Sequence, residues 1–158
     1  GRRQGVGPEG MILGVLRVGV DLGRLDEDEA GFGGQLLDEG LLNIAVGGGF
    51  RAIAASPSET LYVAELDGEV VGTFQTAILT KLVGRGAKSM VIEAVQTRSD
   101  MRGRGIGAVM INYCLEEARR QGLNAAQLTS NMARLDAHRF YERLGFEKRH
   151  LGFRMKLK

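Results

Sequence analysis

The chain has 158 residues, of which 44% are hydrophobic and 25% charged, and its formal net charge is +2 at pH 7. This composition is typical of one globular domain with a buried core, and the nearly balanced charge argues against a nucleic-acid-binding protein. No apolar run reaches the roughly 18 residues of a membrane span, and a single cysteine, Cys114, excludes an internal disulfide framework. We therefore expect a cytoplasmic protein that binds neither membranes nor nucleic acid.

The first third of the chain is rich in glycine and carries the weakest structural signals. Residues 8–20 and 41–55 have apolar patterns that we interpret as helices, although Gly47, Gly48 and Gly49 fit poorly inside the second one.

Three strands are predicted next. The stretch "LYVAEL" (61–66) alternates and is rich in strand-forming residues, Asp67-Gly68 is a hairpin turn signal, and "EVVGTFQTAIL" (69–79) forms the second strand. After a basic loop, "SMVIEAVQT" (89–97) is apolar enough to lie centrally in a sheet.

Two helices and three shorter strands complete the pattern. Apolar residues at helical spacing begin at Ile106 and continue to Cys114, with Gly122 as the C-terminal cap. "NAAQLTS" (124–130) is a short strand, and a second helix with apolar residues from Ala133 to Leu144 ends at Gly145. "FEKRH" and "FRMKL" suggest a closing hairpin. The order after residue 60 is β-β-β-α-β-α-β-β, and we predict a single mixed α/β domain spanning residues 1–158.

The stretch "DMRGRGIGAVM" (100–110) places three glycines at the start of the first helix, where each costs roughly 1 kcal/mol relative to alanine. A helix N-terminus presents free N–H groups and partial positive charge, and glycines let an anion approach them. A Walker A loop is excluded because no Lys-Ser/Thr follows, and the dinucleotide fingerprint G-x-G-x-x-G is incomplete. The stretch therefore predicts a site for another phosphate ligand.

The pattern that fits is R-x-x-G-x-G at Arg102, Gly105 and Gly107, which resembles the coenzyme A pyrophosphate motif of the GNAT superfamily of N-acyltransferases. "IEAVQTRSDMRGRGIG" is similar to that family's strand-to-helix passage, and "DAHRFYERLGF" to its later F-Y-x-x-x-G-F helix. "QLTSNMARLDAHRFYERLGF" is similar to acetyltransferases of the aminoalkylphosphonate type. The resemblance covers residues 61–158 and implies a central, mostly antiparallel sheet flanked by helices, with residues 1–60 on the acceptor side.

The resemblance implies that acetyl-CoA is the co-substrate. The backbone of Val95, Gln96 and Thr97 would pair with the pantetheine arm, an N–H near Val95 would face the thioester oxygen, and Asn131 would contact the cofactor. The residues expected at the pyrophosphate are Arg102, Gly103, Arg104, Gly105, Ile106, Gly107 and Ala108.

Two side chains are candidates for proton transfer. Tyr141 matches the family tyrosine that protonates the departing thiolate, whereas its spacing alone would also fit core packing beside Phe140. Glu93, a charged residue in the apolar "VIEAV", could take the proton of the amine directly or through water. Alternatively, it could pair with a basic neighbour such as Arg85 or Lys88, or point into solvent.

The remaining reactive residues are expected to be structural. His138 sits at helical spacing among polar residues, Cys114 falls on an apolar helix face, and Asn131 could alternatively cap a helix. No metal-ligand spacing is present, so we predict no metal.

We expect an N-acetyltransferase that acetylates a small primary amine by direct attack, because no serine or cysteine is placed as a covalent nucleophile. Two alternatives stay open: a protein N-terminus or lysine as acceptor, or a non-catalytic acyl-CoA-binding regulatory module. A homodimer is common in the family, and the sequence does not decide the oligomeric state.

Overall fold

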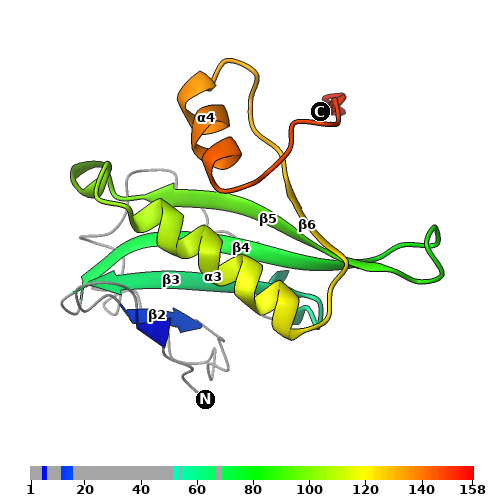
Figure 1. The fold of residues 1–158 in the computed structure, drawn as a ribbon, viewed down its shortest axis with the longest axis horizontal. Helices are drawn as coiled ribbons and strands as arrows, with labels where there is room; N and C mark the ends of the chain where they lie inside the picture. Colours follow the sequence, from blue (N-terminus) through cyan, green and yellow to red (C-terminus); the bar gives the residue numbers. More distant parts are fainter. Residues whose placement is uncertain (1–4, 7–11, 16–51, 54, 67–68) are drawn as a thin grey trace.

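The computed structural model describes residues 5–6, 12–15, 52–53, 55–66 and 69–158 (Figure 1). Its elements are β1 (Gly5–Val6), β2 (Ile12–Val15), β3 (Glu59–Leu66), β4 (Glu69–Thr80), β5 (Lys88–Thr97), the 3-10 turn η3 (Ser99–Met101), α3 (Ile106–Arg120), β6 (Ala125–Leu128) and α4 (Leu135–Arg143). The order predicted from residue 61 to the end of the second helix is confirmed.

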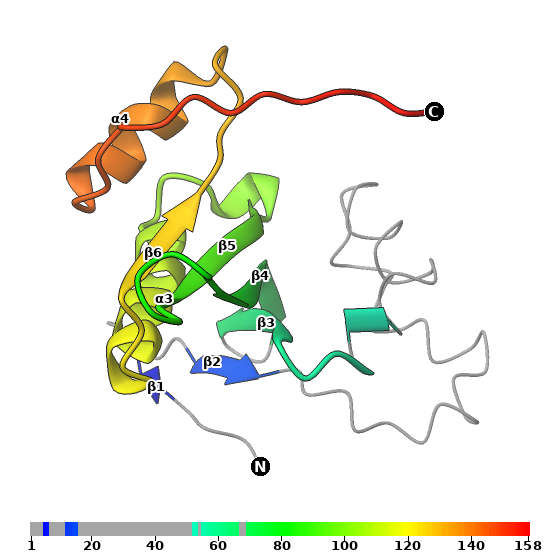
Figure 2. The same cartoon turned by 90° about the vertical axis from the view of Figure 1, so that its right-hand side faces the viewer.

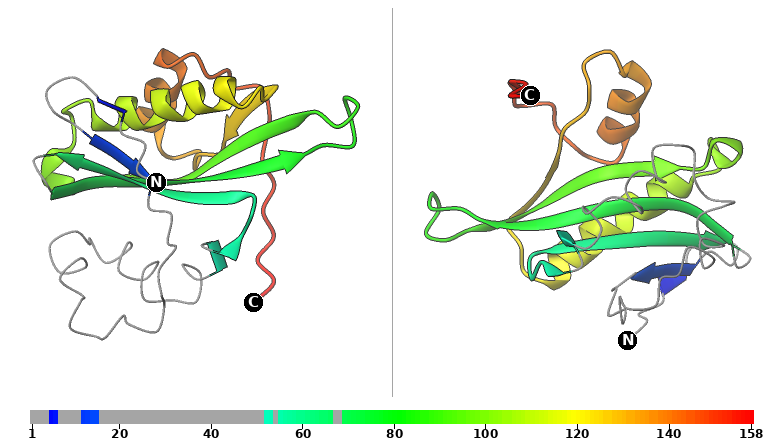
Figure 3. Two further views of the ribbon diagram at one scale, coloured as in Figure 1. Left: turned by 90° about the horizontal axis from the view of Figure 1, so that it is seen from below. Right: turned by 180° about the vertical axis from the view of Figure 1, so that it is seen from behind.

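The strands form one sheet in the order β1-β2-β3-β4-β5-β6. Neighbouring strands are antiparallel except β5 and β6, which are parallel. A parallel pair needs a crossover connection, and α3 supplies it. Figure 3 shows α3 and α4 on the same side of the long strands. The predicted mixed, mostly antiparallel sheet flanked by helices is therefore confirmed.

The core lies between α3 and the sheet. Phe74 of β4 and Met110, Ile111 and Cys114 of α3 are each at most 1% exposed. The ring of Tyr62 stacks on Phe74 with centroids 4.6 Å apart. Burying one large apolar side chain stabilises a fold by about 1.5–3 kcal/mol, so the buried side chains of α3 hold this helix firmly against the sheet.

The end of α3 is set by Gly122, as predicted. Gly122 has a φ of 67°, its N–H donates to the Arg119 carbonyl at 2.9 Å, and the Leu123 N–H donates to the Ala118 carbonyl at 2.9 Å. These are the two hydrogen bonds of a Schellman motif, which needs a residue without a side chain at the left-handed position. The chain then turns directly into β6.

The expected helix over residues 8–20 is wrong at residues 12–15. These residues form β2, which pairs antiparallel with β3 from Ile12 opposite Glu65 to Val15 opposite Tyr62. The edge of β3 offers hydrogen-bonding groups to a segment rich in β-branched residues, and this pairing outweighs an apolar pattern that also fits a helix. In the range 41–55, residues 52–53 and 55 are helical, and the others lie outside the described residues.

The expected closing hairpin is also absent: no strand follows α4 in the described chain. The segment leaves α4 in extended form and runs away from the sheet (Figure 2). Its alternate apolar side chains are 76–95% exposed, namely Leu151, Phe153, Met155 and Leu157. The alternation predicted a half-buried strand, but a two-stranded hairpin without a surface to pack on is marginal in water.

Gly72 of β4 packs tightly against Gln96 of β5 and Met110 of α3. A Cβ at this position would lie 2.9 Å from the carbonyl oxygen of Gln96 and 2.9 Å from Sδ of Met110. We expect Gly72→Ala to lower the free energy of unfolding by about 1–3 kcal/mol, because a backbone oxygen cannot yield as a side chain can. Urea denaturation would measure the change. Gly152→Ala is the matched control, since nothing lies within 4 Å of its added Cβ, and equal urea midpoints for the two variants would contradict the expectation.

Candidate active site

The carboxyl half of β5 has an open edge. β5 pairs with β6 only over residues 89–92, opposite Ala125 to Leu128. Of residues 93–97, Glu93, Gln96 and Thr97 pair with β4 on one side, and none of the five has a partner strand on the other side within the described residues. Figure 1 shows β5 and the chain that follows β6 separating toward α4. An extended ligand can add to such an edge through main-chain hydrogen bonds.

A β-bulge interrupts β5 where its pairing with β6 ends. The register places Ala94 and Val95 together opposite the single residue Phe74 of β4. Ala94 has a φ of 49°, in the left-handed region that residues with a side chain rarely adopt. The extra residue rotates the strand, so Ile92 and Val95 both pack against the core although they are three positions apart. The register gives neither Ala94 nor Val95 a cross-strand partner among the described residues, as is usual for the extra residue of a bulge.

The loop between β5 and α3 adopts a conformation that requires glycine. Gly103 and Gly105 have φ values of 77° and 82°, and nothing lies within 4 Å of a Cβ added at either position. Gly105 is the N-cap of α3 and makes no side-chain cap hydrogen bond. The first backbone bond of the helix joins the Val109 N–H to the Gly105 carbonyl at 3.1 Å. The preceding N–H groups of α3, at Ile106, Gly107 and Ala108, are therefore available to an anion.

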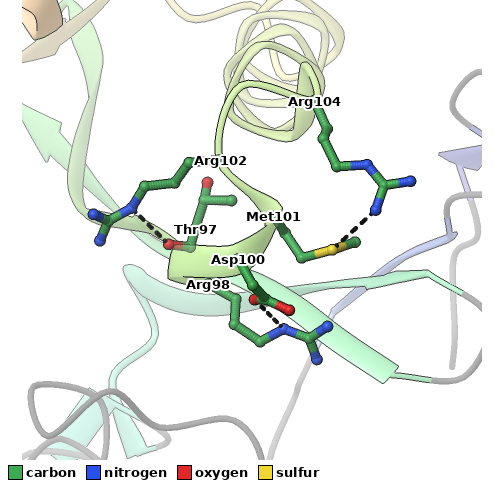
Figure 4. Close-up of polar contacts among 6 residues, drawn as sticks. All are labelled: Thr97, Arg98, Asp100, Met101, Arg102 and Arg104. Carbon is green, nitrogen blue, oxygen red and sulfur yellow. Dashed lines mark hydrogen bonds and ion pairs between the residues drawn. The ribbon is translucent and has the colours of Figure 1, made fainter.

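The two arginines of the loop point to opposite sides (Figure 4). Nε of Arg102 donates to the carbonyl oxygen of Thr97 at 3.4 Å, at the end of β5. Nη1 of Arg104 instead lies 3.1 Å from Sδ of Met101. Both side chains are exposed. The structure brings Arg102 to the end of β5 and directs Arg104 away from it, so the two arginines are not equivalent.

Tyr141 lies on α4 among aromatic neighbours. Its ring centroid is 5.0 Å from that of Phe140 and 5.9 Å from that of Phe146. A second Schellman motif fixes this arrangement: Gly145 has a φ of 90°, its N–H donates to the Glu142 carbonyl at 3.0 Å, and the Phe146 N–H donates to the Tyr141 carbonyl at 3.1 Å. The G-F of the sequence motif therefore closes the helix and seats Phe146 on Tyr141.

Burial raises the pKa of the Tyr141 hydroxyl above its usual value, and the nearby charge of Arg134 acts in the opposite direction. Burial disfavours the charged phenolate. The hydroxyl is thus held in its proton-donating form.

Glu93 is exposed and immediately precedes the bulge. It pairs with Gln75 across the sheet, and the Gln75 amide donates to the Glu59 carboxylate at 3.0 Å. Among the described residues no ion pair joins Glu93 to Arg85 or Lys88, the alternative partners that the sequence suggested. Because Ile92 faces α3, strand alternation directs Glu93 to the opposite face.

Asn131 and its neighbours form the loop between β6 and α4. The side-chain Oδ1 of Asn131 accepts a hydrogen bond from the Ala133 N–H at 2.9 Å. The main-chain carbonyl oxygen of Asn131 lies 2.9 Å from Nε2 of His138. Asn131 closes a turn, whereas the N-cap of α4 is Arg134. His138 thus has a structural partner, in agreement with the sequence-based prediction. Oγ of Ser130 is buried without a hydrogen-bond partner among the described residues.

The sequence singled out the glycine loop and Tyr141 as candidates, but it gave no sign of the bulge at Ala94 or of the buried Ser130 hydroxyl. Alanine does not favour a positive φ, so nothing marks Ala94 except that Glu93 interrupts the apolar run. A lone serine after a strand carries no specific signal.

In the described part of the chain no group of histidine, cysteine or acidic residues could hold a metal ion. No helix there is long and apolar enough to cross a membrane.

The chain belongs to the acetyltransferase (GNAT) family, whose model matches residues 30–146. It is 34% identical over 105 residues to the aminoalkylphosphonate N-acetyltransferase of Salmonella typhimurium, an alignment that covers 66% of this chain and 68% of that one. These findings confirm the resemblance inferred from the sequence. The protein is an acyl-CoA-dependent N-acetyltransferase of the GNAT type.

Two further relatives extend this comparison. The L-methionine sulfoximine/L-methionine sulfone acetyltransferase of Pseudomonas paraeruginosa is 34% identical over 101 residues, covering 62% of this chain and 56% of that one. The crystal structure of a transcriptional regulator from Bacillus halodurans superposes with a TM-score of 0.66 at 37% identity, covering 68% of this chain and 72% of that one.

Cys114 is 1% exposed, and burial raises the pKa of its thiol to about 12. We expect Cys114 of the native protein not to react with a disulfide reagent at pH 8, because the reactive thiolate is neither formed nor accessible. One equivalent should react after denaturation, since the chain has a single cysteine. Measuring absorbance with a disulfide reagent checks this, and stoichiometric labelling of the folded protein would contradict it.

Proposed function

We propose that this chain transfers an acetyl group from acetyl-CoA to the primary amine of a small molecule, by direct attack of the amine. The observation that supports this most strongly is the open half of β5 ending beside an uncapped helix N-terminus. We also propose that residues 1–158 act as one domain, with residues 1–60 on the acceptor side. A cytoplasmic location stays a prediction.

The chemistry of the described residues fits acetyl-CoA. The N–H groups at the start of α3 and the Arg102 side chain would bind the pyrophosphate, whose charge matches theirs. The main chain from Val95 to Thr97 would bind the amide-containing arm as an added strand. The unpartnered hydroxyl of Ser130, beside Asn131, is a polar group that gains a partner if an amide lies there.

Three groups of the chain would then serve the transfer. When bound, acetyl-CoA supplies an activated acyl group as a thioester. The Val95 N–H, freed by the bulge, would donate to the thioester oxygen and stabilise charge that develops there. Glu93 would accept the proton of the amine from the opposite face of the sheet, and Tyr141 would donate a proton to the departing sulfur.

The names of the relatives guide the choice of acceptor. One acetylates aminoalkylphosphonates and another L-methionine sulfoximine or sulfone, all small molecules with an amine and a second polar group. We propose an acceptor of this class. Release of free thiol from acetyl-CoA with aminomethylphosphonate and L-methionine sulfone would test it.

Calorimetric titration with acetyl-CoA tests the binding site. We expect micromolar affinity in the wild type, at least 10-fold weaker binding in Gly105→Val because the side chain crowds the anion site, and no binding of ATP or NAD.

The matched control for Gly105→Val is Gly86→Val. Both glycines have nearly the same positive φ, 82° and 83°, and both have free space around them. A valine is strained at either position, so both variants lose stability, whereas only the change at Gly105 should reduce affinity for acetyl-CoA. Equal affinities in the two folded variants would refute the loop assignment.

For Tyr141→Phe we expect kcat to fall about 100-fold with acetyl-CoA affinity unchanged, because a general acid is removed. In the wild type, burial raises the pKa of the Tyr141 hydroxyl above its usual value near 10. Deprotonation of this hydroxyl should therefore lower the wild-type kcat only above pH 10. Tyr113→Phe, on α3, is the matched control. Wild-type turnover by Tyr141→Phe across the pH profile would return Tyr141 to a packing role.

A further inference from the structure

Gly107 differs from the other two glycines of its loop. It does not have the positive φ of Gly103 and Gly105, so an L side chain would not strain its backbone. A Cβ at Gly107 would, however, lie 3.3 Å from Cζ and 3.8 Å from Cε2 of Phe140. The space next to Gly107 is therefore occupied by an aromatic ring of α4, and the reason for glycine here is a contact between two helices.

The same point adjoins the end of β5. Oγ1 of Thr97 lies 4.0 Å from the Cβ position of Gly107. Phe140 thus meets the chain where the open edge of β5 ends and α3 begins, the two features proposed to bind acetyl-CoA. Its neighbour in sequence is Tyr141, and the two rings are in edge contact.

The rest of α4 is held lightly. No residue of α4 is fully buried, and its charged side chains, such as those of Asp136 and Arg139, are exposed. The residues that attach this region to the core are partly buried: Phe140, Tyr141, Leu144 and Phe146. Among these, Phe140 has its ring against Gly107 of the loop, so the size of this ring contributes to the distance between α4 and the loop.

We propose that Phe140 is a positioning residue for the acetyl transfer: its ring rests on Gly107 and holds α4 where Tyr141 can reach the departing sulfur. This inference rests on the proposed function. It assigns to Gly107 a role in seating α4 that is separate from the approach of an anion.

A positioning role predicts a loss of turnover without a loss of binding. We expect Phe140→Ala to lower kcat about 10- to 100-fold, because a displacement of about 1 Å at a reacting group costs on that order, while the calorimetric affinity for acetyl-CoA changes less than about 3-fold. Phe140→Leu, which keeps an apolar contact, should lie between the wild type and Phe140→Ala. Phe153→Leu is the matched control, since this phenylalanine is 95% exposed.

Paired substitutions at Gly107 and Phe140 distinguish a specific contact between these two residues from a general loss of packing. Gly107→Ala should push the ring away and lower kcat, and Gly107→Ala combined with Phe140→Leu should recover part of that loss, because the smaller side chain leaves room for the added methyl group. The kinetics would use whichever of aminomethylphosphonate and L-methionine sulfone the wild type acetylates faster. Thermal unfolding would confirm that each variant is folded.

The outcomes are distinguishable. A wild-type kcat in Phe140→Ala, a fall in affinity that matches the fall in kcat, or a double variant in which the two single losses simply multiply would each overturn the proposal. If the wild type binds no acetyl-CoA, the proposed function fails and this inference fails with it. Wild-type binding and turnover together with an unimpaired Phe140→Ala would refute the inference alone.

Discussion

Four residue pairs join β5 to β6, and the parallel ladder then stops while β5 continues to Thr97. Unsatisfied main-chain groups at a sheet edge are costly when covered and attract another chain when exposed. Among the described residues no strand covers this edge, residues 93–97 contain no proline, and the bulge at Ala94 adds a local twist. The early end of the β5–β6 pairing therefore leaves open the edge that we propose as the binding surface, and the other proposed parts of the site lie around it.

Rigid and lightly held parts meet at this edge. α3 is fixed on the sheet by a fully buried aromatic and aliphatic core, so the glycine loop at its N-terminus has a defined position. α4 contributes no fully buried residue and depends on a few half-buried rings. The groups proposed to bind the co-substrate thus belong to the rigid part, whereas the proposed acid belongs to the part that fewer contacts restrain.

The sequence predicted the elements whose determinants are local. Alternation and the Asp67-Gly68 signal located β3 and β4, and glycines at positions 122 and 145 located both helix ends, where the structure shows Schellman motifs. Features that depend on distant partners were not predictable: β2 forms because β3 offers an edge, and the bulge forms between two strands. Gly107 looked like part of an anion site from its spacing, but its neighbour Phe140 lies 33 positions away along the chain and becomes visible only in three dimensions.

The parallel pairing of β5 and β6 also constrains the order in which the chain can fold. β3, β4 and β5 follow one another as antiparallel neighbours, so their contacts are local and can form early. β6 is joined to β5 through the crossover that contains α3, so their contacts are less local in sequence and are expected to form later. During synthesis the amino-terminal strands can assemble while the ribosome still holds α4. The proposed acetyl-transfer site is then among the last parts of the molecule to be completed, and a chain truncated before residue 125 would lack β6 and α4 altogether.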